Sequence, residues 1–349
     1  MRDPGSMNGS RGNHTQRART AFAMQDLRLR NALFPKRSLA RISELVPPVS
    51  DVVITDFAAE NDQTLSEVEV LVTGWSAPLL DAGTLERMPK LRLICHAGGS
   101  VKEHLDSAVW SRGIAVTNAA HANAIPVAEF TVALIILAGK DLLSARHLYA
   151  VRQGFVDREA EFAGAGNYGK TIGIIGASTI GRLVIGLLHD LDAEILLYDP
   201  TVTDAEAKAL RTHKVDLNEL LCRSDIVSLH APLLPETEGM LGAEELALLR
   251  DGSCLINTAR GKLLDHQALR AELQGGRISA YLDVTDPEPL LPGDSLYSLP
   301  NVLLTPHIAG AMGTELHRLG AAVVTEIERY VSGLPLLRPV MAGDLTTTA

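Results

Sequence analysis

The stretch Thr171–Gly181 reads Thr-Ile-Gly-Ile-Ile-Gly-Ala-Ser-Thr-Ile-Gly and decides the fold class of this chain. It begins as an apolar run typical of a buried parallel strand, turns at a glycine and continues as the start of a helix. A phosphate-binding turn of this kind needs glycine at three places, and the second place is Ser178. Its hydroxyl can donate to a phosphate oxygen, or its Cβ can crowd it. We expect a dinucleotide phosphate to bind at the start of this helix, against Gly176, Ser178, Thr179, Ile180 and Gly181.

A carboxylate follows the next apolar run. Asp199 directly follows Glu194–Tyr198, where an acid accepts from the ribose 2′-hydroxyl and repels a 2′-phosphate. The residues 200–203 include no arginine or lysine that would bind such a phosphate. This pattern predicts NAD rather than NADP, the alternative being that Asp199 is only a turn or helix-capping residue.

Apolar runs alternate with helical stretches on both sides of this unit, which predicts parallel sheets. The first series is Val52–Thr55, Val68–Thr73, Leu91–Cys95 and Ile114–Thr117; the second is Thr171–Ile175, Glu194–Tyr198, Ile226–Leu229, Ser253–Ile256, Ile278–Leu282 and Val302–Leu304. We expect an α/β protein of two domains: a Rossmann-type doubly wound cofactor domain of six strands, and a smaller flavodoxin-like parallel-sheet substrate domain.

Two long helical stretches fix the expected domain boundaries. Ala124–Arg152 is apolar on most of its circumference at its start, as in a buried helix, and Met312–Val331 has one apolar face. The second of these would return the chain to the first domain. We therefore expect a discontinuous substrate domain at 26–120 and 311–349, a cofactor domain at 121–310, and a disordered extension at 1–25.

Composition restricts the class of protein. The formal net charge of −10 argues against general nucleic-acid binding. Cys95, Cys222 and Cys254 show no paired or metal-ligand spacing and lie in or near apolar runs, so we expect reduced core cysteines, no metal site and a cytoplasmic protein. The apolar run Phe130–Gly139 is too short to span a membrane.

Three further motifs each follow a strand of the second series. They are Asn257–Gly261 (Asn-Thr-Ala-Arg-Gly), Asp283–Pro289 (Asp-Val-Thr-Asp-Pro-Glu-Pro) and Thr305–Gly310 (Thr-Pro-His-Ile-Ala-Gly). The ends of parallel strands meet at one sheet edge, so an arginine, a carboxylate and a histidine are brought together there. Arginine binds a carboxylate, and histidine moves a proton near neutral pH. Any one motif alone is usually a turn or a surface ion pair, but three in order are not.

From about Ser50 to about Leu337 the chain resembles the D-isomer-specific 2-hydroxyacid dehydrogenases. The resemblance implies a catalytic set of Arg260, Glu288 and His307, a homodimer, and NAD-dependent interconversion of a 2-oxo acid and its (R)-2-hydroxy acid. It also implies that Asp283 holds the nicotinamide carboxamide while His230 and Ala259 line the cofactor, and that backbone amides of Gly99, Ser100 and Val101 meet the substrate carboxylate.

The chain departs from the family after that glycine-rich segment. The family continues with Asp-Asn-x-Asp, whereas this chain reads Lys102-Glu103-His104-Leu105. His96 and Lys102 could add positive charge near an acidic substrate, although such residues are more often solvated. Trp75 could line the pocket and favour a larger side group, or serve packing alone. Two alternatives stay open: a relative that oxidises an unusual small acid of the formate or phosphite type, and an NAD-sensing corepressor-like binding protein.

Overall fold

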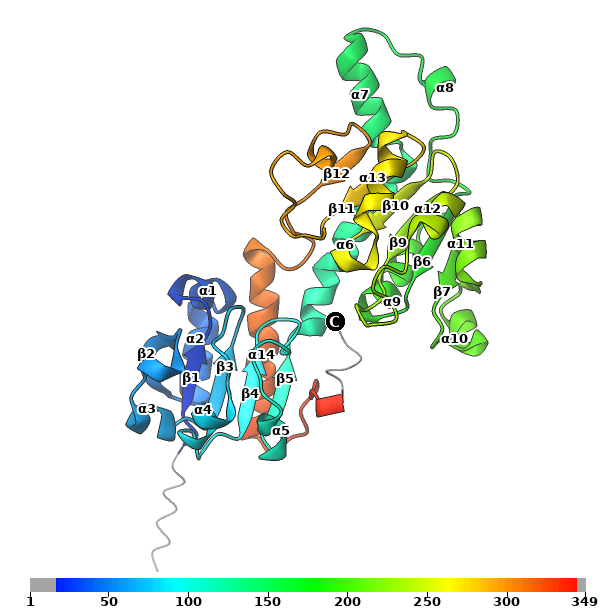
Figure 1. Ribbon diagram of the computed structural model, residues 1–349. Helices are drawn as coiled ribbons and strands as arrows, with labels where there is room; N and C mark the ends of the chain where they lie inside the picture. Colours follow the sequence, from blue (N-terminus) through cyan, green and yellow to red (C-terminus); the bar gives the residue numbers. More distant parts are fainter. Residues whose placement is uncertain (1–16, 344–349) are drawn as a thin grey trace, which may run out of the picture.

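The computed structural model describes residues 17–343. Figure 1 shows two lobes, each built on one sheet, with the chain crossing between them along α6 (Ala120–Gly139) and before α14 (Leu316–Val331). The two helices contact each other. Near the crossings, the Asn123 side-chain oxygen accepts a hydrogen bond from the backbone nitrogen of Ala311 at 2.9 Å, so the two connecting segments are joined side to side.

The first lobe has a parallel sheet in the order β2-β1-β3-β4-β5, the flavodoxin-like order. Its strands are β1 (Thr20–Ala23), β2 (Pro48–Ile54), β3 (Val70–Thr73), β4 (Leu93–His96) and β5 (Ala115–Asn118). Its helices are α1 (Leu27–Leu33), α2 (Lys36–Leu45), α3 (Asp62–Ser66), α4 (Ala82–Glu86) and α5 (Ala108–Ser111).

Strand β1 corrects one expectation from the sequence. We expected 1–25 to lie outside the fold, but β1 is fully buried and pairs with both β2 and β3. Its sequence Thr-Ala-Phe-Ala is short and contains two alanines, which have weak strand preference. Residues 1–16 lie outside the described residues.

The second lobe has a parallel sheet in the order β12-β11-β10-β9-β6-β7-β8. Its strands are β6 (Thr171–Ile175), β7 (Glu194–Tyr198), β8 (His213–Lys214), β9 (Ile226–Leu229), β10 (Cys254–Asn257), β11 (Ser279–Leu282) and β12 (Val302–Leu304). This is the doubly wound order with the switch point between β6 and β9, which confirms the predicted fold class. The additional strand β8 has two exposed residues, too few for an apolar pattern to reveal it.

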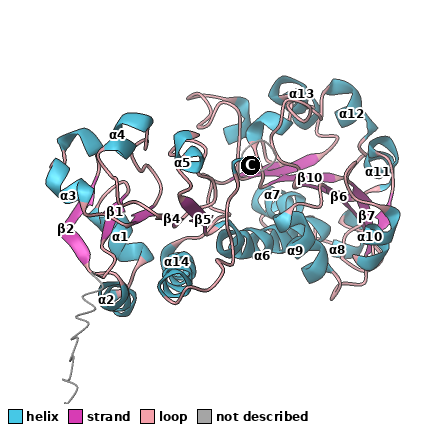
Figure 2. Cartoon of the chain, turned by 90° about the horizontal axis from the view of Figure 1, so that it is seen from below, coloured by secondary structure: helices cyan, strands magenta, loops and turns pink. Residues whose placement is uncertain are grey.

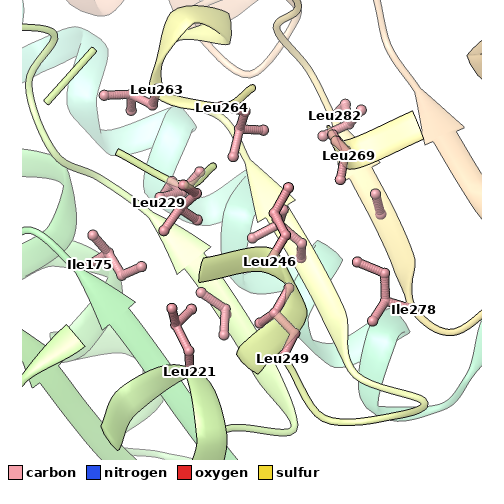
Figure 3. Packing of buried hydrophobic residues seen from close by; sticks show 14 of the residues in the cluster. Ile175, Leu221, Leu229, Leu246, Leu249, Leu263, Leu264, Leu269, Ile278 and Leu282 are labelled. Atoms are coloured by element: carbon pink, nitrogen blue, oxygen red, sulfur yellow. The ribbon is translucent and has the colours of Figure 1, made fainter. Parts of the chain in front are cut away.

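Helices cover both faces of both sheets (Figure 2). In the second lobe they are α9 (Thr179–Leu188), α10 (Asp204–Ala209), α11 (Leu217–Arg223), α12 (Ala243–Leu248) and α13 (His266–Gln274). Figure 3 shows one of the two cores of this lobe, in which Ile175 and Leu229 of the sheet lie among Leu221, Leu246 and Leu269 of the helices. Such burial is the main stabilising contribution to a domain of this kind.

Helix α6 is long and apolar enough to cross a membrane by length and composition, and half of its most apolar window is buried in the structure. It packs against α9, α14, β9 and β10, so it is a core helix. The predicted stretch Ala124–Arg152 is broken after α6, because Asp141 adopts a positive φ of 50° before α7 (Leu142–Arg152) begins. In Figure 1, α7 and α8 (Arg158–Glu161) project from the second lobe.

The end of the chain returns to the first sheet. Helix α14 packs on α1, α2 and β4. Beyond it, the Val340 nitrogen donates to the Val116 carbonyl at 2.8 Å, and the buried Glu326 carboxylate accepts from the backbone nitrogens of Leu337 and Arg338. The boundaries expected near residues 121 and 310 stay a prediction. Cys95 and Cys254 are buried as expected, but Cys222 is exposed, because it lies on the solvent side of α11.

Candidate active site

A tight turn after β12 presents His307. This residue has a φ of +55°, a left-handed backbone conformation that residues other than glycine seldom adopt. The conformation is held by Asp283, directly after β11. Its backbone oxygen accepts from the His307 nitrogen at 2.9 Å, and its buried carboxylate accepts from the backbone nitrogens of Ile308 and Ala309, each at 2.8 Å, and from the Thr305 hydroxyl. Asp283 therefore shapes the turn that carries the histidine.

The histidine and the glutamate form a pair. The Nδ1 atom of His307 lies 2.7 Å from Glu288 Oε1, and both side chains are about half exposed. A carboxylate on Nδ1 fixes the orientation of the ring and stabilises its charged form. The opposite nitrogen, Nε2, is then the atom that can exchange a proton with a substrate.

Arg260 follows β10 and lies near this pair. Burial lowers the pKa of Arg260, and the carboxylate of Glu288 raises it in opposition, so the guanidinium stays charged. The buried Asn257 shapes the turn: its side-chain nitrogen donates to the Arg260 carbonyl at 2.9 Å, and its side-chain oxygen accepts from the Ala259 nitrogen at 3.0 Å. The carboxylate of Glu288, after β11, thus acts on the guanidinium of Arg260, after the neighbouring strand β10.

In the phosphate-type turn, which joins β6 to α9, close contacts leave no room for a side chain at two of the glycines. A Cβ on Gly176, where φ is +96°, would meet the Ala231 nitrogen at 2.6 Å, and a Cβ on Gly181 would meet the carbonyl oxygen of Gly176. Ser178 caps α9: its hydroxyl oxygen accepts from the Gly181 nitrogen at 3.2 Å, so its hydrogen remains for another acceptor. Thr179 and Ile180 form the first turn of α9. Contact of these residues with a phosphate stays a prediction.

Asp199 lies at the end of β7 beside this turn. Its carboxylate accepts from the Ala177 nitrogen at 2.7 Å and from the nitrogen and hydroxyl of Thr201. Burial raises the pKa of Asp199, but the hydrogen bonds from Thr201 and Ala177 outweigh it and hold the pKa below its usual value. The group is therefore an anion next to the turn between β6 and α9; that it selects between ribose substituents stays a prediction.

His230 is buried under the same turn. Its Nε2 atom lies 2.9 Å from the Ser228 hydroxyl, and burial lowers its pKa to about 3, so the ring is neutral. A Cβ on Gly181 would lie 3.2 Å from the His230 Cβ. These contacts show a packing role, and contact of His230 or Ala259 with a cofactor stays a prediction.

In the first lobe, the segment after β4 leaves open space. A Cβ on Gly99 would meet nothing within 4 Å, while the Gly99 carbonyl accepts from the Asn118 side chain at 2.9 Å. Ser100 is half-buried, its Oγ accepting from the Lys102 nitrogen at 3.4 Å, and Val101 is buried. Trp75 is half-buried, close to Gly98.

His96 is neither the positive charge nor the solvated residue that the sequence allowed. The ring is buried, its Nδ1 lies 2.9 Å from the Thr73 hydroxyl, and its Nε2 has no hydrogen-bond partner within residues 17–343. Burial, with a smaller effect of His104, lowers the pKa of His96 to about 3, so it stays neutral. Lys102 is exposed.

Two polar residues behind the site, Asn257 and Thr131, were given no role from the sequence. Asn257 shapes the Arg260 turn as described above. Thr131, in the middle of α6, has its hydroxyl oxygen 2.8 Å from that of Thr258, which precedes Ala259. Both threonines are buried. Asn257 could have been found from the sequence because it belongs to the strand-end motif Asn257–Gly261. A single threonine in an apolar helix, such as Thr131, gives no sequence signal of a role at the site.

Comparisons with known proteins agree with this geometry. Residues 132–309 match the model of the D-isomer specific 2-hydroxyacid dehydrogenase, NAD binding domain. The chain is 33% identical over 262 residues to D-3-phosphoglycerate dehydrogenase of Archaeoglobus fulgidus, covering 75% of this chain and 49% of the relative. It is 32% identical over 311 residues to glyoxylate reductase of Korarchaeum cryptofilum, covering 86% of this chain and 91% of the relative.

A solved structure, the apo D-mandelate dehydrogenase of Rhodotorula graminis, superimposes with a TM-score of 0.75 at 27% identity, covering 93% of this chain and 98% of that one. The chain spans about half the length of the first curated relatives it matches. The matched domain contains the phosphate-type turn and the Arg260, Glu288 and His307 positions, and its cofactor is NAD. The chain belongs to the D-isomer-specific 2-hydroxyacid dehydrogenase family.

Proposed function

We propose that the protein is an NAD-dependent oxidoreductase that interconverts a 2-oxo acid and its (R)-2-hydroxy acid. The observation that carries this proposal is the 2.7 Å pair of His307 Nδ1 and Glu288 Oε1, next to the charged Arg260, on a domain of the NAD-binding type. A proton donor beside an anion-binding cation is what the reduction of a carbonyl next to a carboxylate requires. Bound NADH supplies the hydride.

The three residues of the set have different roles in this proposal. Arg260 binds the substrate carboxylate and polarises the carbonyl. His307 donates its Nε2 proton to the carbonyl oxygen as negative charge develops there, and takes it back in the oxidative direction. Glu288 orients the imidazole through Nδ1 and stabilises the imidazolium form.

The first lobe supplies the second half of the substrate site. The open space at Gly99 leaves the backbone of Gly99, Ser100 and Val101 free to approach a carboxylate, and Trp75 stands beside Gly98. An anion held from both lobes favours their approach, which excludes water from the reacting atoms. The relatives named above act on glyoxylate, D-3-phosphoglycerate and D-mandelate, so the size of the group on C2 is set by side chains such as Trp75.

Assembly and location follow the family in this proposal. The projecting segment of α7 and α8 exposes Tyr149, Val151 and Phe155, and Tyr149 and Phe155 line a groove of about 620 Å³. A second copy of the chain would cover it, giving a homodimer. The net charge of −10 gives no support to a nucleic-acid partner, and we place the protein in the cytoplasm.

A panel of 2-oxo acids tests the function. NADH oxidation is followed at 340 nm with glyoxylate, hydroxypyruvate and phenylpyruvate, each compared with its amide. We expect turnover of at least one acid, with the amide far poorer, because the amide lacks the charge that Arg260 binds. Absence of turnover across the panel, or equal rates for acid and amide, would contradict the proposal.

Cofactor choice gives a second test. We expect NADH to be preferred over NADPH, because the anionic Asp199 repels a 2′-phosphate. Replacing Asp199 with serine and Pro200 with arginine should shift the ratio of the kcat/KM values toward NADPH by at least about tenfold, since it removes the repulsion and adds a phosphate partner. Native use of both cofactors with equal efficiency would show that Asp199 is only a turn residue.

A further inference from the structure

His266 is a buried histidine outside the catalytic set. It is the first residue of α13, follows the Arg260 loop, and is 7% exposed. Its Nε2 atom accepts a hydrogen bond from the backbone nitrogen of Asp286 at 3.2 Å, two residues before Glu288. Its Nδ1 atom lies 3.3 Å from the Leu264 carbonyl oxygen.

These two partners define the state of the ring. A backbone nitrogen can only donate, so Nε2 must carry no proton, and a carbonyl oxygen can only accept, so Nδ1 must carry one. The ring is therefore neutral, with its proton on Nδ1. Burial lowers the pKa of His266, Arg270 adds to that effect, and the Leu264 carbonyl, Asp286 and Asp294 oppose it. Asp294 is itself paired with Arg270 at 2.7 Å.

A second contact joins the same two loops. A Cβ on Gly261 would collide with the Thr285 carbonyl group, and it would lie 2.7 Å from the Asp286 nitrogen. The residue after Arg260 thus packs directly against the residues before Glu288. Leu263 and Leu264, between Gly261 and His266, are anchored in the core shown in Figure 3.

We propose that His266 is a positioning residue that fixes the Glu288 loop against the Arg260 loop and thereby aligns the carboxylate with His307. Glu288 itself is exposed, as are Asp286, Pro287 and Pro289. The chain between Thr285 and Pro289 therefore takes little support from burial. Two contacts connect this segment to the core of the second lobe: the hydrogen bond from the Asp286 nitrogen to His266 Nε2, which we call the tether, and the close packing of Gly261 against Thr285 and Asp286.

The inference rests on the proposed function for its catalytic consequence, but the tether itself is independent of activity. Without an acceptor at His266 Nε2, the Asp286 amide loses its partner and the loop gains freedom. Glu288 then spends less time on His307 Nδ1, so the imidazolium loses stabilisation. Reduction needs the protonated ring, so its rate should fall at a lower pH than in the native protein.

The experiment compares four variants with the native protein. His266→Phe keeps a ring but removes the acceptor. His266→Gln places an amide oxygen near the position of Nε2 and restores it. Glu288→Gln is the reference for loss of the carboxylate, and His213→Phe, on the exposed edge strand β8, controls for a histidine-to-phenylalanine change elsewhere.

Two readouts are measured. The first is the alkaline limb of kcat/KM for reduction, with the KM for NADH. The limb should move to lower pH in His266→Phe, toward that of Glu288→Gln, with kcat about tenfold lower and the KM for NADH unchanged. His266→Gln and His213→Phe should keep the native limb. A variant that is merely less folded loses activity without moving the limb.

The second readout is hydrogen exchange of the peptide 283–291, read by mass spectrometry, which needs no turnover. Exchange should be faster in His266→Phe and native-like in His266→Gln. If the native protein reduces no 2-oxo acid, the proposed function fails, but the exchange measurement still shows whether His266 restrains the loop that carries Glu288. Native exchange in His266→Phe, or faster exchange with an unmoved limb in an active enzyme, would overturn the positioning role.

Discussion

Arg260→Ala is expected to lower kcat/KM for the 2-oxo acid by a factor equivalent to ~2–5 kcal/mol of transition-state stabilisation, the cost of leaving a charged group without its buried partner. The guanidinium is mostly buried, and within residues 17–343 it forms no ion pair with a carboxylate; its Nη1 donates to the carbonyl of Ala259 at 2.7 Å. A substrate carboxylate would complete its hydrogen bonds. The affinity for NADH, measured by fluorescence titration, should stay native.

Two controls distinguish this role from loss of structure. Arg260→Lys should recover only part of the loss, since an ammonium group does not bind a carboxylate in bidentate fashion. Arg250→Ala removes an arginine that is half exposed and paired with Asp225 at 2.9 Å, and it should leave kcat/KM near native. Near-native kcat/KM for Arg260→Ala would remove this residue from the substrate site.

His307→Ala is the second change with a large expected effect. General acid catalysis contributes about 10²–10⁴-fold, so kcat should fall by that order in both directions of the reaction. The loss should appear in kcat more than in the KM for the substrate, because the proton is transferred only as the reaction proceeds. Single-turnover kinetics with NADH measures the step directly.

The matched control for that variant is His317→Ala, an exposed histidine at the start of α14. It should leave kcat unchanged. If His307→Ala kept more than about a tenth of the native kcat, the general-acid effect would be too small for the proposed proton donor.

The strand ends could be predicted from the sequence because they combine two local signals. The apolar run before Asn257, Asp283 or Thr305 indicates a buried strand, and the polar residues after it indicate a functional edge. Since parallel strands end at the same edge, the topology predicted that a carboxylate and a histidine meet there, and the resemblance to the family identified them as Glu288 and His307. Their 2.7 Å contact is a consequence of that order.

What the sequence did not show depends on partners far along the chain. Strand β1 is a short apolar run with weak strand preference, and its pairing with β2 and β3 specifies it as a strand. His96 reads as a possible cation, but its position at the end of β4 buries it. The role of His266 depends on a backbone nitrogen twenty residues later, which no periodicity reveals.

The return of the chain to the first lobe has a consequence during protein synthesis. Phe22 and Phe34 near the beginning share one core with Leu319, Val323 and Ile327 of α14. The second lobe is made of consecutive residues and can fold as the ribosome extends the chain. The first lobe must wait with that core exposed until the last helix has left the exit tunnel. We infer that the order of folding is the reverse of the order of the sheets along the chain, and that aggregation during translation would begin at the early half of the first lobe.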